Sequence, residues 1–259
     1  MKVDLHNHTK LCNHAEGEME EYVQKAIEIK TEYFGFSDHA PMEFDKRYRM
    51  NIKDMNFYEN EVKRLREKYK DKIEIFLGYE VDYIKGYIQE RVLKAKVDYL
   101  IGSVHFIEGW CFDNPEFIGK YKNKDIDKIW QDYFDEIEKM AKSGLFQIAG
   151  HLDLIKIFNF KSKKDVRLIA KDAIKAIRRS NMSVELNSAG FRKPVKECYP
   201  GDKLLELIKE NDITITFGSD AHKREQVGYK TKELENKAKE FGYDRCALFR
   251  NKEREMINF

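Results

Sequence analysis

The segment Val3-Asp4-Leu5-His6-Asn7-His8 decides how this chain folds, because a short apolar run ends directly in two histidines. Four further apolar runs also end in a histidine, and a fifth ends in a glutamate. They are residues 35–39, 100–105, 147–151, 218–222 and, for the glutamate, 75–80. The carboxyl ends of parallel strands meet at the same edge of a sheet. We therefore expect these strand ends to converge, although they are far apart in the sequence.

Short strand-like runs alternate with longer amphipathic stretches along the chain. The expected strands are residues 2–6, 33–37, 73–80, 99–104, 146–150, 183–187 and 214–219. The expected helices are residues 18–30, 53–69, 89–95, 125–142, 164–179, 202–209 and 231–241. Such alternation is typical of parallel strands joined by helical crossovers. Seven units in 259 residues predict a single α/β domain, residues 1–259, built as a barrel of seven strands. An open doubly wound sheet is the alternative.

The lengths of the expected loops differ between the two ends of the strands. The helix-to-strand connections are short, as at residues 30–32, 143–145, 180–182 and 211–213. The strand-to-helix connections are long, at residues 39–52, 106–124 and 188–201. Barrels carry their function on the loops that follow the strands. The site is therefore expected at that face, where segment 106–124 is either a lid over the site or packing on the barrel rim.

Charge and cysteine content limit the possible partners. The chain has 48 Lys and Arg against 46 Asp and Glu, so it lacks the basic footprint of a protein that binds nucleic acid or an anionic membrane. Its 4 cysteines form no Cys-x-x-Cys pair, which favours reduced thiols in a cytoplasmic protein. No signal peptide or membrane-spanning run is expected. The oligomeric state is left open.

The histidines are the candidate ligands of a metal cluster. Five of the 7 end an apolar run, and none falls within an expected helix. His6 and His8, like Asp220 and His222, are separated by two positions, so on extended chain their side chains leave the same side. Imidazole suits zinc, iron or manganese, and a carboxylate can bridge two cations.

These motifs together resemble those of the polymerase and histidinol phosphatase (PHP) superfamily. They are Asp4-Leu5-His6-Asn7-His8-Thr9 with His14, Ser37-Asp38-His39, Gly78-Tyr79-Glu80, Ser103-Val104-His105, Gly150-His151-Leu152-Asp153 and Gly218-Ser219-Asp220-Ala221-His222. The resemblance covers nearly the whole chain. It implies a distorted (β/α)7 TIM-like barrel that holds two to three divalent ions.

The resemblance also implies which residues bind each ion. A first ion takes His6, His8, Glu80 and Asp220. Glu80 then bridges to a second ion, which His105 and His151 complete. The third ion takes His14, His39 and His222. Cys12 lies between two of the motifs, where it is either a soft ligand or, as the favoured interpretation, a small buried side chain.

The segment from Glu185 to Pro194, followed by Tyr199-Pro200, resembles the histidinol-phosphate phosphatases of this superfamily. That likeness implies hydrolysis of L-histidinol phosphate to L-histidinol and phosphate, a step of histidine biosynthesis, through a metal-bridging hydroxide. Two alternatives stay open. One is a related phosphoesterase that acts on nucleotides or nucleic-acid 3′ ends, and the other is a metal-binding barrel without turnover.

Several polar residues are candidates for the remaining roles. Arg192 is expected to bind the phosphate bidentately, through two guanidinium N–H groups, assisted by Lys193 or Lys156. Glu185 and Asn187 are expected to contact the substrate, with Glu185 meeting its ammonium group. Lys156-Ile157-Phe158 is less basic than the corresponding family segment. Asp153, with Asp4 and Asp38, is expected to orient imidazoles through their distal N–H groups.

Overall fold

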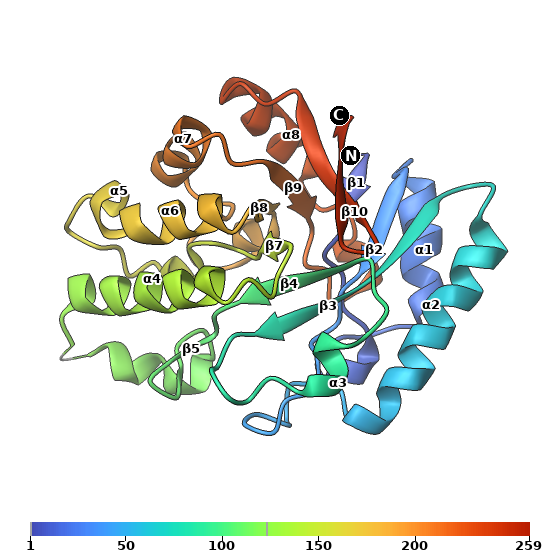
Figure 1. The fold of residues 1–259 in the computed structure, drawn as a ribbon, viewed down its shortest axis with the longest axis horizontal. Helices are drawn as coiled ribbons and strands as arrows, with labels where there is room; N and C mark the ends of the chain where they lie inside the picture. Colours follow the sequence, from blue (N-terminus) through green and yellow to red (C-terminus); the bar gives the residue numbers. More distant parts are fainter. Residues whose placement is uncertain (1, 123) are drawn as a thin grey trace.

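Seven parallel strands form a nearly closed barrel in the computed structural model, which describes residues 2–122 and 124–259 (Figure 1). In sheet order they are β1 (Val3–Asp4), β2 (Tyr33–Phe36), β3 (Glu74–Asp82), β4 (Tyr99–Ser103), β7 (Ile148–Ala149), β8 (Ser183–Asn187) and β9 (Ile215–Gly218). The last strand returns to the first, because Leu5 N donates to Phe217 O at 2.9 Å and Asp220 N donates to His6 O at 2.7 Å. The barrel prediction is confirmed, and the open doubly wound sheet was the wrong alternative.

Helices lie outside this ring of strands (Figure 1). They are α1 (Met19–Glu28), α2 (Met55–Tyr69), α3 (Glu90–Leu93), α4 (Ile126–Lys142), α5 (Val166–Ile169), α6 (Lys171–Arg179), α7 (Asp202–Glu210) and α8 (Thr231–Glu240). Helix α4 shows why they form. The Asp125 side chain accepts from Asp127 N at its start, and Ile129, Tyr133 and Ile137, four residues apart, are buried on one face. The expected helix 164–179 is divided at Ala170 into α5 and α6.

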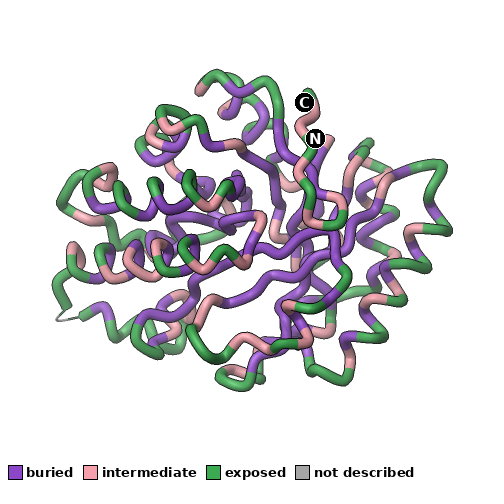
Figure 2. Tube along the Cα trace, in the orientation of Figure 1, coloured by how far each residue is buried: buried purple, intermediate pink, exposed green. Residues whose placement is uncertain are grey.

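The barrel strands consist almost entirely of buried residues (Figure 2). Tyr99 crosses the barrel and donates its hydroxyl to Leu5 O at 2.5 Å. The ring needs glycine on β2 and β3, because a Cβ at Gly35 in β2 would lie 2.0 Å from the Tyr99 hydroxyl. A Cβ at Gly78 would lie 2.4 Å from the same ring. Tyr99 therefore explains two glycines inside otherwise apolar strands.

Two hairpins were not predicted. β10 (Arg245–Arg250) and β11 (Glu253–Asn258) pair antiparallel near the C-terminus, joined by Asn251 and Lys252 with φ of 51° and 69°. A two-residue turn of this kind usually carries Asn-Gly, and that signal is missing here. The second hairpin, β5 (Phe106–Ile107) with β6 (Trp110–Cys111), lies in segment 106–124.

The remainder of segment 106–124 includes a 3₁₀ helix, η3 (Pro115–Tyr121), while its Asn123 lies outside the described residues, as Met1 does. Across residues 2–122 and 124–259, the structure contains no helix that combines the length and apolar character needed to cross a membrane.

Candidate metal centre

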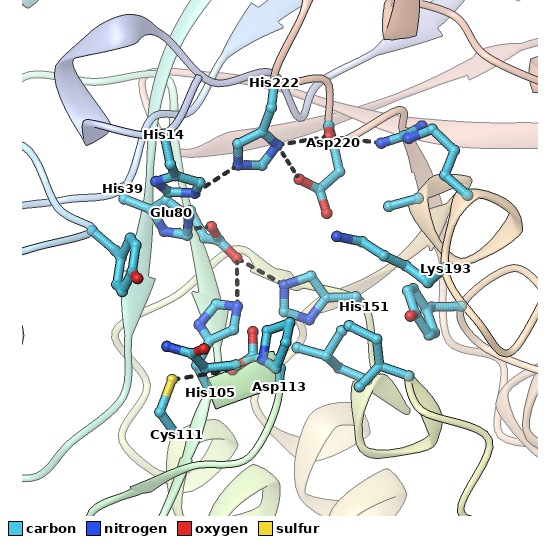
Figure 3. Close-up of a pocket in the computed structure, with 18 of the residues that line it drawn as sticks. His14, His39, Glu80, His105, Cys111, Asp113, His151, Lys193, Asp220 and His222 are labelled. Atoms are coloured by element: carbon cyan, nitrogen blue, oxygen red, sulfur yellow. Dashed lines mark hydrogen bonds and ion pairs between the residues drawn. The ribbon is translucent and has the colours of Figure 1, made fainter. Parts of the chain in front are cut away.

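The ends of the barrel strands surround a cavity of about 450 Å³ (Figure 3). Most of the predicted metal ligands line it, namely His14, His39, Glu80, His105, His151, Asp220 and His222. His6 and His8 follow β1 and are buried beside these residues, with ring centroids 5.0 Å apart. The structure therefore brings all nine predicted ligands to one face of the barrel, as parallel strands require.

Glu80, in β3, lies at the centre of this cluster and is 1% exposed. Its Oε1 lies 2.8 Å from His151 Nε2 and 3.7 Å from His105 Nε2. Its Oε2 instead lies 2.9 Å from His39 Nδ1 and 3.5 Å from His6 Nε2. The two oxygens of one carboxylate thus face different histidines, which is the arrangement that bridging between two cations needs.

Pairs of imidazole nitrogens also face each other across short gaps. His6 Nε2 lies 3.1 Å from His8 Nε2, and His14 Nε2 lies 3.0 Å from His222 Nε2. Two nitrogens that each lie roughly 2.0–2.1 Å from one zinc ion are separated by about 3 Å. The donor set therefore fits metal ions chemically and geometrically.

The ligand atoms gather into groups whose members all lie within 4.8 Å of one another. Three groups correspond to the sets inferred from the sequence: His6 with His8 and Glu80, Glu80 with His105 and His151, and His14 with His39 and His222. Asp220, expected in the first set, has Oδ1 3.2 Å from His8 Nε2. A fourth group joins Cys12 to His8 and His222. Its thiol is buried, and burial is the main cause that raises the pKa of Cys12.

Hydrogen bonds at Nδ1 turn the opposite nitrogen of several rings toward the cavity. His6 Nδ1 donates to Glu185 Oε1 at 2.6 Å, and His105 Nδ1 donates to Asp82 Oδ1 at 2.6 Å. In two other rings Nδ1 donates to a backbone carbonyl, from His14 to Cys12 O at 2.9 Å and from His222 to Asp220 O at 3.1 Å. Such contacts fix the tautomer that a metal ligand needs.

The local electrostatics differ between the ligand sets. Burial alone would lower the pKa of His105, but the carboxylates of Asp82 and Glu80 outweigh burial and raise it to about 9. Burial would likewise raise the pKa of Glu80, but the surrounding histidines, His39 first, hold it well below its usual value. In the third ligand set, by contrast, burial holds the pKa of His39 and His222 well below the usual value, so these imidazoles are neutral and free to bind a cation.

The carboxylates that orient imidazoles are not all those expected. Asp38 does contact a ring, with Oδ1 3.4 Å from His8 Nδ1. Asp4 instead accepts from Ser219 N at 2.8 Å and Gly228 N at 3.3 Å, so it ties β1 to the chain after β9. Asp153 accepts from Gly201 N at 2.9 Å and pairs with a lysine. The prediction that Asp4 and Asp153 orient imidazoles was therefore wrong.

Two residues expected at the substrate belong to the ligand scaffold instead. Glu185 uses Oε1 for His6, while its Oε2 accepts from His151 N at 2.9 Å. Asn187 donates to the same Oε2 at 3.0 Å and accepts from Ala189 N at 2.8 Å. Both side chains are buried and neither is among the residues that line the cavity, so their contacts with substrate stay predictions. These contacts could not be predicted from the sequence, because both residues lie within β8 and only the tertiary structure shows which groups their side chains face.

Arg192 lines the cavity, as expected, but only part of its guanidinium is free. Nη2 donates to Ser219 O and Asp220 O, each at 2.9 Å, whereas the buried Nη1 has no partner within residues 2–122 and 124–259. The sequence predicts a bidentate contact with the phosphate. Because the two carbonyls already accept from Nη2, Nη1 is the terminal nitrogen that remains available to bind an anion. Lys193 is exposed, and its ammonium points toward the space between His151 and Asp220 (Figure 3).

Lys156 lies elsewhere. Its Nζ lies 2.9 Å from Asp153 Oδ2 and donates to Cys198 O at 2.8 Å, and its side chain is 3% exposed. It lines a second cavity of about 520 Å³ rather than the one with the histidines. The short 3₁₀ turn after His151 directs Lys156 away from the barrel mouth, so this structure does not support its predicted contact with the phosphate.

Two residues that the sequence reasoning missed support His105. Asp82 accepts from His105 Nδ1 through Oδ1, and its Oδ2 lies 2.6 Å from Arg49 Nη2. All three side chains are buried. The position of Asp82, two residues after Glu80 in the same strand, was a usable signal, because alternate residues of a strand share a face.

Comparisons with known proteins agree with this geometry. Residues 4–189 match the PHP domain family. The chain is 34% identical to a probable histidinol-phosphatase of Deinococcus radiodurans over 96% of each chain, and 28% identical to the histidinol-phosphatase of Bacillus subtilis over 88% of this chain and 96% of the relative. Its fold matches a crystal structure of histidinol phosphate phosphatase from Lactococcus lactis complexed with zinc, L-histidinol and phosphate, at a TM-score of 0.80, with 22% identity and 98% of both chains covered.

Proposed function

The chain belongs to the PHP domain family, and on that premise we propose that it is a phosphoric monoester hydrolase that converts L-histidinol phosphate to L-histidinol and phosphate. The observation that carries the proposal is the placement of Glu80, whose two oxygens face separate groups of histidines within one cavity. The histidinol-phosphatase relatives, one of them 34% identical over nearly the full chain, support the choice of substrate.

Metal ions are part of this proposal. Two to three divalent ions, zinc, manganese or iron, would be held by three sets of ligands: His6, His8, Glu80 and Asp220; Glu80, His105 and His151; and His14, His39 and His222. Bound there, such ions neutralise phosphoryl oxygens and make water a nucleophile at neutral pH. The buried contacts of Glu185 and Asp82 keep two of the imidazoles in the orientation that this binding requires.

The cavity has walls of opposite charge, and this supports a substrate with both an anionic and a cationic group. Arg192 and Lys193, from the segment after β8, supply the positive charge for the phosphate. Asp113 comes from the segment after β4 and lies on a different side of His151 from Lys193 (Figure 3). Its half-buried carboxylate suits the ammonium group that histidinol phosphate carries and a simple aryl phosphate lacks.

The decisive experiment compares kcat/KM for histidinol phosphate, a panel of nucleoside monophosphates and an aryl phosphate, with bound metals quantified in the same preparation. A clear preference for histidinol phosphate supports the proposal. A preference for nucleotides would replace the substrate, and metal binding without hydrolysis of any ester would remove the enzymatic activity. A cytoplasmic location and the lack of a nucleic-acid partner stay predictions.

A further inference from the structure

The segment after β8 contains two buried hydrogen-bond donors that have no partner among the described residues. They are Arg192 Nη1 and the Tyr199 hydroxyl. Both residues line the cavity that contains the predicted metal ligands. Other tyrosine hydroxyls of the barrel are paired, as Tyr58 with Gly78 O at 2.9 Å and Tyr243 with Ile213 O at 3.1 Å.

The unpaired hydroxyl is held in place by its surroundings. Tyr199 is 0% exposed, and its backbone exchanges two hydrogen bonds with Asn187, at 3.0 Å and 2.7 Å. Its ring lies edge-on to the His151 ring with centroids 6.4 Å apart, and a Cβ at Gly190 would lie 3.0 Å from its Cζ. The ring therefore cannot turn to find another partner without moving β8 or the His151 side of the site.

A buried polar group without a partner costs about 1–3 kcal/mol, and the great majority of such groups in folded proteins are satisfied. A phenol hydroxyl carries its proton at neutral pH, so a group that accepts hydrogen bonds would satisfy it. Arg192 lines the same cavity, and its unpaired Nη1 needs an acceptor too, preferably one with negative charge. A phosphoryl group, with several anionic oxygens, can meet both.

We propose that Tyr199 is a substrate-contacting residue, whose hydroxyl donates a hydrogen bond to a phosphoryl oxygen while Arg192 Nη1 binds the same group. The inference rests on the proposed function, since it assumes that a phosphate ester occupies the cavity. Tyr199 would add a neutral hydrogen-bond donor to the two charged residues of the cavity that are proposed to bind the phosphate, Arg192 and Lys193. Tyr199 thus orients the phosphate without adding charge to a centre that must also release its product.

The test is the variant Tyr199→Phe, which removes only the hydroxyl, with Tyr243→Phe as the matched control. Binding of inorganic phosphate to each metal-loaded protein is measured by calorimetry, together with metal content and the melting temperature of the ligand-free protein. We expect Tyr199→Phe to bind phosphate about 10- to 100-fold more weakly. Its melting temperature should stay equal or rise, because an unpaired buried hydroxyl has been removed. Tyr243→Phe should melt lower and bind phosphate like the wild type.

Unchanged phosphate affinity in Tyr199→Phe would overturn the inference. So would weaker binding accompanied by metal loss and a lower melting temperature, because that pattern indicates a structural role. The proposed function is judged separately by whether the wild-type protein hydrolyses histidinol phosphate. A wild type that binds phosphate through Tyr199 but hydrolyses another ester would leave this inference standing and overturn only the substrate.

Discussion

The carboxylate of Glu80 contacts His151 through Oε1 alone, 2.8 Å from Nε2, while its Oε2 faces the opposite group of histidines. Through its two oxygens Glu80 contacts a member of each ligand set, including His39 of the third, so it is the residue whose loss should damage the centre most. It lies near the end of β3, where the strand meets the barrel mouth.

Glu80→Ala should therefore lose metal from two of the three ligand sets and nearly all phosphatase activity, since no other side chain can bridge them. Elemental analysis of the purified variant measures this directly. Glu74→Ala, at the start of the same strand, is the control and should keep its metals. Full metal occupancy in Glu80→Ala would refute the bridging assignment.

Asp82→Asn should weaken metal binding at the His105 set, because the amide cannot hold the imidazole as an ionised carboxylate does. Losses of about 10- to 100-fold in metal affinity or activity are typical for such supporting carboxylates. Titration of the metal-free variant with zinc provides the measurement. Asp98→Asn, which alters a buried carboxylate outside the site, should show wild-type zinc affinity.

Arg192→Ala should reduce kcat/KM for histidinol phosphate by about 10- to 150-fold, corresponding to roughly 1.5–3 kcal/mol for a hydrogen bond to a charged group. Arg192→Lys should restore only part of the lost kcat/KM. A single ammonium group cannot donate to the carbonyls of Ser219 and Asp220 and bind the phosphate at the same time. Metal content is expected to be retained. Arg224→Ala, an exposed arginine after β9, serves as the control, and equal kcat/KM values for all variants would show that Arg192 does not contact the substrate.

Asp113→Asn should separate recognition of the leaving group from recognition of the phosphate. With histidinol phosphate, kcat/KM should fall about tenfold or more, because the ammonium group loses its counter-charge. With an aryl phosphate it should hardly change. Asp132→Asn on α4 should affect neither substrate. An equal fall with both substrates would mean that Asp113 acts on the phosphate or the metals instead.

Lys156→Met should lower the free energy of unfolding by about 3–5 kcal/mol, since it leaves the buried carboxylate of Asp153 without its partner. Urea denaturation measures the loss. The double variant Lys156→Met with Asp153→Asn should recover much of it, and Lys161→Met, at an exposed lysine, should change little. If Lys156→Met were as stable as the wild type but bound phosphate more weakly, Lys156 would have a role in binding the phosphate rather than in stability.

The strand ends and the residues placed there could be read from the sequence. The position of a histidine that follows an apolar run can be inferred from the sequence, because the carboxyl ends of parallel barrel strands all lie at one face. That rule alone brought His6, His39, His105 and His151 together, and the resemblance to a known family supplied the grouping around Glu80. The C-terminal hairpin was missed because its turn, Asn251-Lys252, lacks the usual glycine.

What the sequence alone determined about this protein is therefore the barrel and the face that carries its ligands, since both follow from local periodicity and strand direction. Only the tertiary structure decided which acidic side chain supports which imidazole, that Lys156 leaves the site, and that carbonyls occupy Arg192 Nη2. These outcomes depend on contacts between residues far apart in the chain, as between His6 and Glu185. A local pattern places a side chain on a strand, but strand pairing and loop path determine what that side chain meets.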